Sequence, residues 1–347
     1  QDGRFIPTID GGRILLKLLP WPLRRVVVSK EAAPFIAKGK TLFCKHVVDI
    51  DPEIRDVLDI ACFPSYPRMD YHRMPNYEGL KIFSALNAIC VSYFFYGGKT
   101  DEAGRPVLSA RVVIFSKKAF NTYGRDIIII RDFLKGLKDI RYASGDSLIH
   151  LIEENSLISS RNKFVSYIKL FNRNFLAQSI NCLIANRQVN ICYHDKQVAE
   201  SFIRIVYSLL PLSTVEKSSF SSECSDPDSP FAENYVLVPK QTMQQVFGWK
   251  VPKFGRKAPR RAKIDLEKQQ AQGGKYVKLI DGILSELMHR DEWYTIPWRE
   301  KYLILLEFFD GIVSKRISNL ITLSDKLTKM YYTLNRVKAL EKLASKV

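Results

Sequence analysis

The stretch RVVVSKEAAPFIAKGKTLFCKHVVDIDPEIR (residues 25–55) shows how the beginning of this chain is built. Its first residues, 26–28, are three valines, whose β-branched side chains predict a strand. Residues 30–37 have the composition of a short helix, and Gly39 follows them at a place where glycine commonly ends a helix. Residues 42–50 again have strand composition and lead into a polar turn. We therefore predict the order strand, short helix, strand.

The next part of the chain continues as mixed α/β sequence. Residues 63–76 are rich in Tyr and Pro and predict an irregular loop. Residues 88–96 and 107–115 are two β-rich runs, and the sequence GGKTDEAGRP between them predicts a hairpin. The four isoleucines at 127–130 predict a third strand, followed by an amphipathic helix around 132–137.

From about residue 146 the hydrophobic pattern becomes helical. Apolar residues recur at three- and four-residue steps, which predicts helices at 148–152, 164–171, 175–184 and 198–210. A β-branched run at 188–193 interrupts them and predicts one strand. Residues 213–230 are rich in Ser, Asp and Pro and predict a loop or a domain boundary. A short strand at 235–238 and helices from 275 onward complete the pattern.

Residues 250–263 form the most basic segment of the chain and contain no acidic residue. Pro252, Gly255 and Pro259 oppose a regular helix there, so we predict an extended cationic strap. Each cation that neutralises a phosphate releases counterions, which gives affinity for nucleic acid regardless of its sequence. Trp249 and Phe254 are predicted to stack on bases. The predicted phosphate contacts of the strap are Lys250, Lys253, Arg256, Lys257, Arg260, Arg261 and Lys263.

Composition agrees with a folded, strongly basic protein. The 347 residues are 46% hydrophobic and 26% charged, which is ordinary for globular domains. The formal charge of +17 favours polyanions, either nucleic acid or an anionic membrane face. No apolar run is long enough for a transmembrane helix, and residues 1–12 lack a signal or transit pattern. The six cysteines form no CxxC pair, which predicts buried, reduced thiols in a cytosol or organelle matrix.

Residues 2–55, with the strand, the helix ending at Gly39 and the closing DPEIR, resemble the PUA domain, a small RNA-binding barrel. Within that family the resemblance is greatest to the end of archaeal tRNA-guanine transglycosylases. Residues 104–131 (GRPVLSARVVIFSKKAFNTYGRDIIIIR) are similar to the closing strands of the family. Residues 57–103 stand where the family has a short hairpin. The catalytic barrel and zinc-binding cysteines of the transglycosylases have no counterpart here, so the resemblance does not imply their base-exchange reaction.

The resemblance implies that the helix and its glycine turn form part of an RNA-binding surface. The corresponding residues are Lys38, Gly39, Lys40 and Lys45, where cations and backbone amides can meet phosphate together. The alternative is that these lysines, like those of the strap, are solvated surface charges. For the strap, contact with anionic lipid is a further alternative.

A second resemblance runs through residues 88–211. The hairpin and helix, followed by NRNFLAQSINCLIANRQVNICYHDKQVAESFIRIVYSLLP (residues 172–211), resemble the longin and DENN arrangement of folliculin-type proteins. There a helix, a short strand after a polar turn and a second helix ending in Leu-Pro follow in that order. This resemblance implies a regulator or scaffold of small GTPase signalling at membranes.

No motif predicts catalysis. His194-Asp195 lacks a second His/Asp cluster and is interpreted as a turn, not a metal site. Gly97-Gly98-Lys99 and Gly273-Gly274-Lys275 lack the flanking residues of a phosphate-binding loop. We therefore predict a non-catalytic protein without metal or cofactor, and keep an enzyme acting on RNA as a third hypothesis.

These observations predict an α+β fold, in which an N-terminal mixed α/β region, either a PUA-like small barrel or a longin-like sheet, precedes a helix-rich C-terminal domain. The predicted segments are a PUA-like domain at 1–140 with an insertion at 57–103, a helix-dominated segment at 146–212, a linker at 213–234, and the strap with its helical region at 235–347. The predicted partner is structured RNA, tRNA or rRNA, with proteins of a ribonucleoprotein assembly. The alternative partner is a small GTPase or a DENN protein. The expected location is inside the cell, in the cytoplasm rather than an organelle matrix.

Overall fold

The computed structural model divides into two compact units, Gln1–Ala61 and Cys62–Val347. The residues that the structure describes are 26–28, 47–50, 63, 76–85, 88–100, 106–137, 145–224, 227, 232–240, 261–289, 297–315 and 334–347.

The described part of the first unit is a pair of strands. β1 (Val26–Val28) and β2 (Val47–Ile50) pair antiparallel, with Val26 opposite Ile50. The register shifts by one residue between Val27 and Val28. Both predicted strands are thus confirmed for these residues. The predicted helix at 30–37 lies outside the described residues.

The second unit is built on a seven-stranded sheet with the order β5-β4-β3-β7-β8-β6-β9. Its first half is an antiparallel meander, which confirms the predicted hairpin. Val91, in the middle strand, lies opposite Ile82 on one side and Val113 on the other. The three strands are β3 (Glu78–Ala85), β4 (Ala88–Thr100) and β5 (Pro106–Ser116).

The other half of the sheet is parallel. β7 pairs antiparallel with β3 and parallel with β8, so it joins the two halves. β6 lies between β8 and β9 and is parallel to both. Every residue of β6 is buried, as expected for a parallel strand in the interior of a sheet. These strands are β6 (Val189–Tyr193), β7 (Phe220–Ser221), β8 (Tyr235–Pro239) and β9 (Ala262–Asp265).

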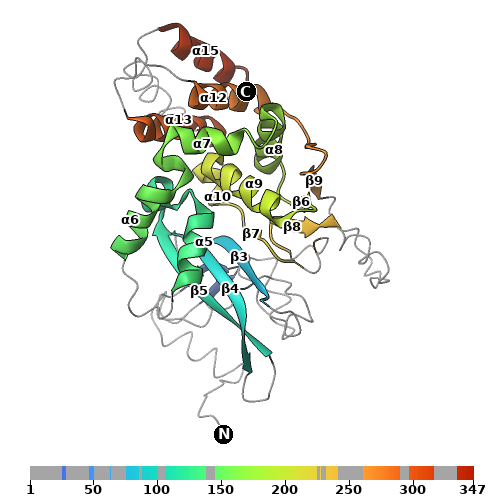
Figure 1. The fold of residues 1–347 in the computed structure, drawn as a ribbon. Coiled ribbons are helices and arrows are strands. Elements are labelled where there is room, and N and C mark those ends of the chain that lie inside the picture. Colours follow the sequence, from blue (N-terminus) through green and yellow to red (C-terminus); the bar gives the residue numbers. More distant parts are fainter. Residues whose placement is uncertain are drawn as a thin grey trace, which may run out of the picture. The chain divides into compact units, whose positions relative to one another are not determined.

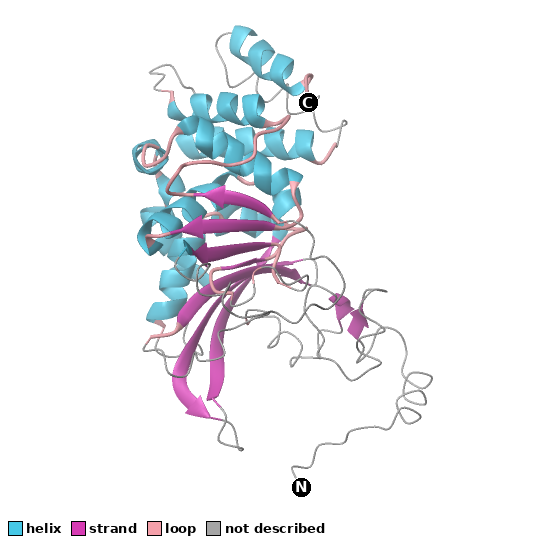
Figure 2. Ribbon diagram, turned by 90° about the vertical axis from the view of Figure 1, so that its right-hand side faces the viewer, coloured by secondary structure: helices cyan, strands magenta, loops and turns pink. Residues whose placement is uncertain are grey.

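Helices gather on one side of this sheet (Figures 1 and 2). α9 (Lys196–Leu209) illustrates why they form, because Asp195 caps its first turn and the helix stops before Pro211. The predicted helices of the middle segment are confirmed as α6, α7, α8 and α9. The other helices are α4 (Lys117–Ala119), η3 (Phe120–Gly124), α5 (Ile127–Gly136), α6 (Gly145–Asn155), η5 (Leu157–Ser159), α7 (Arg161–Ile168), α8 (Arg173–Ala185), α10 (Leu212–Val215), α12 (Val277–Met288), α13 (Trp298–Val313) and α15 (Leu334–Ala344).

One hydrophobic core joins the sheet to the helices. It extends from Leu80 on β3 to Leu340 on α15 and includes Phe202 of α9 and Phe309 of α13. Phe202 packs against both Phe171 and Phe175, with ring centroids 5.6 and 5.8 Å away. The α+β fold class is confirmed.

The four isoleucines at 127–130 are helical, so the predicted third strand is wrong. They begin α5, where the Asp126 carboxylate accepts a hydrogen bond from the Ile129 amide. All four are buried, and α5 packs on β4 and β5. The first turn of α5 is buried all round and therefore has apolar residues at four consecutive positions, a pattern that in the sequence is indistinguishable from a buried strand. The segment 104–131 therefore supplies β5 but no final barrel strand at 127–130.

The prediction that residues 213–230 are a loop is also wrong for their first part. α10 covers Leu212–Val215, and β7 inserts Phe220 and Ser221 into the sheet. Phe220 is fully buried and contacts Tyr207 of α9, with ring centroids 5.7 Å apart. A two-residue strand in a serine-rich segment is too short to show the alternation of apolar and polar residues by which strands are recognised in a sequence.

Cys90, Cys182, Cys192 and Cys224 are buried, reduced thiols, as predicted. The other two cysteines, Cys44 and Cys62, lie outside the described residues. Within the described ranges, no helix combines the length and the apolar character that crossing a membrane requires.

Candidate functional site

The predicted strap connects two parallel strands of the sheet. β8 ends at Pro239 and β9 begins at Ala262, and both pair with β6. The strap residues Lys250, Lys253, Arg256, Lys257 and Arg260, with Trp249 and Phe254, lie outside the described residues. Arg261 and Lys263 are described.

Arg261 and Lys263 differ in their surroundings. The Arg261 guanidinium donates hydrogen bonds to the backbone carbonyls of Glu233 and Asn234, at 2.7 and 2.9 Å. It thereby ties the start of β9 to the start of β8. Lys263 is exposed on β9, opposite Asn190 of β6. Of the two, the Lys263 side chain is therefore the more accessible to a polyanion.

The other predicted RNA contacts belong to the first unit. Lys38, Gly39, Lys40 and Lys45 lie outside the described residues. In the sequence they stand between β1 and β2, which pair with each other. RNA contact at these residues stays a prediction.

Charged residues gather at the carboxyl ends of the parallel strands. His194 follows β6, Lys240 follows β8, and Asp265 ends β9. Lys240 Nζ lies 2.9 Å from Asp265 Oδ1 and also contacts Glu267, whose Oε2 lies 3.1 Å from His194 Nε2. This edge is the common place for ligands in parallel sheets. Here, however, Lys240 is bound to both carboxylates, so its positive charge is already compensated within the cluster.

These contacts change the acidity of the cluster. The hydrogen bond that Lys240 donates to the Glu267 carboxylate raises the pKa of Lys240 and lowers the pKa of Glu267. Burial by itself raises the pKa of Asp265, but the hydrogen bonds from Lys240 and the Lys268 amide outweigh it, and the pKa is lowered. Lys240, Asp265 and Glu267 were not among the site residues predicted from the sequence. The available signal for Lys240 was its position just after the predicted strand at 235–238, whereas no strand was predicted at 262–265.

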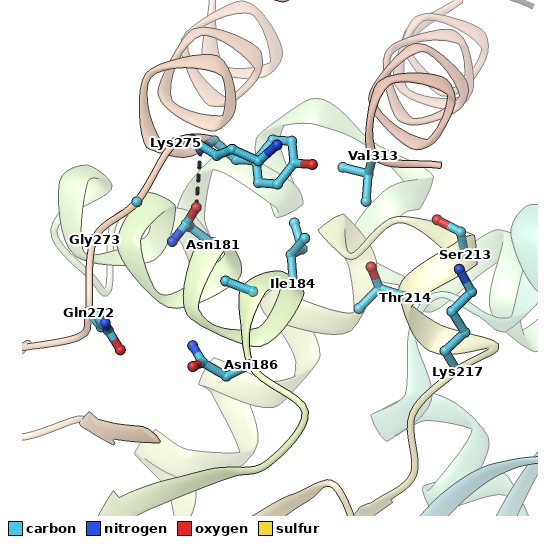
Figure 3. A pocket seen from close by; sticks show the side chains of 13 residues that line it. Asn181, Ile184, Asn186, Ser213, Thr214, Lys217, Gln272, Gly273, Lys275 and Val313 are labelled. Atoms are coloured by element: carbon cyan, nitrogen blue, oxygen red, sulfur yellow. Dashed lines mark hydrogen bonds between the residues drawn. The ribbon is translucent and has the colours of Figure 1, made fainter. Parts of the chain in front are cut away.

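A pocket of about 510 Å³ lies on the helical side of the second unit (Figure 3). The end of α8, the α10 segment, the residues before α12 and the end of α13 form its walls. Gly273-Gly274-Lys275, interpreted from the sequence as a turn, precedes α12 and lines the pocket. The lining residues are Asn181, Ile184, Ala185, Asn186, Ser213, Thr214, Lys217, Gln272, Gly273, Gly274, Lys275, Tyr276 and Val313.

Asn181 fixes the wall of the pocket next to α12. It is buried, and its Oδ1 accepts a hydrogen bond from the Tyr276 amide at 3.1 Å. Gly274 packs directly on it, because a Cβ at Gly274 would lie 2.5 Å from Asn181 Nδ2. The approach of the chain to α8 thus requires glycine at 274. A single sequence does not show this requirement, since residues 181 and 274 are brought together only by the fold.

A 55-residue segment of the chain is similar to archaeal tRNA-guanine(15) transglycosylases. The identity is 51% with the enzyme of Pyrococcus furiosus, 48% with that of Korarchaeum cryptofilum and 44% with that of Methanocaldococcus jannaschii. The segment is 16% of this chain and covers 9%, 9% and 8% of these enzymes. No protein-family model and no solved structure matches the chain. The predicted resemblance to the transglycosylases is thus confirmed for one short segment.

Proposed function

We propose that this chain binds structured RNA, tRNA or rRNA, without catalysing a reaction on it. The similarity of a 55-residue segment to enzymes named for their action on tRNA carries the proposal. That segment is less than a tenth of each enzyme. We therefore infer RNA binding for this chain from the similarity, but not the base-exchange reaction.

The charge of the chain supports the same partner. With 53 Lys and Arg against 36 Asp and Glu, the chain attracts polyanions at ordinary salt concentrations. We assign phosphate contact to the cations near Gly39 and to the strap at 250–263, and base stacking to Trp249 and Phe254. Because tRNA and rRNA are found inside cells, we propose the cytoplasm as the compartment. Proteins of a ribonucleoprotein assembly are the proposed protein partners there.

Binding of the full chain to tRNA and rRNA fragments, measured over a salt series, tests the proposal. We expect binding at about 50 mM salt and an affinity that falls steeply as salt rises, because each phosphate contact releases counterions. Absence of binding at low salt, or an affinity that does not depend on salt, contradicts the proposal.

The second candidate function is a longin- and DENN-like regulator of small GTPases. The observation that favours it is an open sheet in the described part of the chain, with β5 and β9 at its edges and α5 following the meander. The order α8, β6, α9 also agrees with that arrangement. This function predicts stable association with a GTPase or a DENN protein, measured by pull-down, and indifference of that association to charge reversal in 250–263.

A further inference from the structure

The pocket described above has an unbalanced positive charge. Two lysines line it, Lys217 and Lys275, and none of its lining residues is Asp or Glu. The nearby Asp310 carboxylate is already bound by the Ser213 amide and hydroxyl, at 2.8 and 2.6 Å. The pocket therefore offers cations without lining carboxylates to neutralise them.

No described Asp or Glu side chain forms an ion pair with either lysine. Lys217 is exposed. Lys275 Nζ contacts the backbone oxygen of Val347 at 3.1 Å and the Tyr276 ring at 4.6 Å from its centroid. Figure 3 shows the two lysines on opposite sides of the pocket, with Ile184 and Thr214 between them. An anion that enters the pocket thus meets a cation on each side.

The size of the pocket and its uncharged lining indicate an organic ligand. A volume of about 510 Å³ is much larger than an inorganic anion needs and lies in the usual range for small-molecule sites. Thr214, Asn186 and Gln272 provide hydrogen-bonding groups, and Ile184 and Val313 provide apolar surface. The backbone at Gly273 is open, since a Cβ there would meet nothing nearer than Gln178 at 4.0 Å.

We propose that this pocket binds a phosphomonoester on a group of nucleotide size. The phosphate pairs with Lys217, the organic group packs against Ile184 and Val313, and Lys275 adds positive charge on the opposite side. The site belongs to the second unit and does not depend on the RNA-binding function proposed above. Its phosphomonoester has two sources, a free mononucleotide or the phosphorylated end of an RNA chain.

Calorimetric titration of the full chain with adenosine 5′-monophosphate and with adenosine tests the site. We expect the nucleotide to bind with Kd below about 1 mM and adenosine to bind at least tenfold more weakly, since the charged group supplies the main contacts. A 5′-phosphorylated oligoribonucleotide and its 5′-hydroxyl form distinguish the two sources. Binding that needs the 5′-phosphate of the oligonucleotide, without binding of the free nucleotide, assigns the pocket to an RNA end.

Two variants connect the binding to the pocket. Lys217→Glu reverses one of its charges, and Gly273→Asp adds a carboxylate where there is room for a side chain. Each should weaken phosphomonoester binding at least tenfold. Lys278→Glu, an exposed residue of α12 outside the lining, is the matched control and should leave binding unchanged. Circular dichroism checks that all three are folded.

The outcomes separate clearly. No binding of either phosphomonoester, or equal weakening by Lys217→Glu and Lys278→Glu, overturns the proposal. Nucleotide binding by a chain that does not bind tRNA leaves the pocket assigned and removes only the proposed function.

Discussion

Arg204 of α9 forms a bidentate ion pair with Asp126, the residue that caps α5. Nε and Nη2 of the arginine lie 2.8 and 2.7 Å from the two carboxylate oxygens. Asp126 is fully buried and also accepts a hydrogen bond from the Leu157 amide at 2.7 Å. Arg204 in turn donates to the Tyr167 hydroxyl at 2.6 Å. One carboxylate thus connects α5, η5 and α9, and through Arg204 reaches α7.

Loss of this carboxylate should destabilise the fold strongly. Asp126→Ala leaves Arg204 largely buried without its counter-charge, which typically costs about 3–5 kcal/mol of unfolding free energy. Urea denaturation measures the change, and adding Arg204→Met to Asp126→Ala should recover part of the loss. Arg173→Ala is the control, because its ion pair with Asp281 is exposed and should contribute less than about 1 kcal/mol. Equal effects of Asp126→Ala and Arg173→Ala would show that the buried pair is unimportant.

Gly79 of β3 should not tolerate a side chain. A Cβ there would lie 2.3 Å from Cζ of the buried Phe94, so Gly79→Ala should cost about 1–3 kcal/mol through overpacking. Thermal denaturation measures the loss, and Phe94→Leu in the same chain should restore part of it. Gly136→Ala, at the end of α5 with nothing within 4 Å, should be neutral or slightly stabilising. The explanation fails if Gly79→Ala is as harmless as Gly136→Ala.

The cluster at the carboxyl ends of the parallel strands should make the stability of the fold depend on pH in the acidic range. Lys240 lowers the pKa values of Asp265 and Glu267 below their ordinary 3.8 and 4.5. A carboxylate with a depressed pKa in the folded state stabilises the fold above its unfolded-state pKa, and this contribution is lost as pH falls through the folded-state pKa. Stability should therefore decline from about pH 4.5 downward.

Lys240→Met removes the cause of both depressed pKa values. In that variant the decline of Tm below about pH 4.5 should be shallower than in the unchanged chain. Calorimetry at a series of pH values measures it, and Lys278→Met is the control for loss of one positive charge. An unchanged pH profile in Lys240→Met would refute the assignment.

The strap should determine how strongly RNA binding depends on salt. Changing Lys250, Lys253 and Lys257 together to Gln should lower the slope of log K against log salt by about 0.7–0.9 per lost phosphate contact. Lys118, Lys169 and Lys342, which are exposed elsewhere, give a matched triple with the same loss of charge. Filter binding over a salt series compares the two. If both triples change the slope equally, overall charge and not the strap attracts the RNA.

Sequence patterns were sufficient where a segment has one buried face. The β4–β5 hairpin was predicted because turn residues separate two β-rich runs, and α9 because its apolar residues recur with helical spacing. The same patterns failed for the isoleucines of α5, which are buried on nearly all sides, and for β7, which has only two residues. In both places burial is set by distant parts of the chain.

The candidate sites divide in the same way. The amino-acid composition by itself determined the +17 charge. The basic segment at 250–263 and the resemblance to the tRNA enzymes could also be read from the sequence, because each depends on residues near one another in the chain. Only the tertiary structure decided that Lys217 and Lys275 share a pocket, that Gly274 packs on Asn181 and that Lys240 binds Asp265. The physical reason is that these pairs are far apart in sequence and meet only when the sheet and its helices pack into one core.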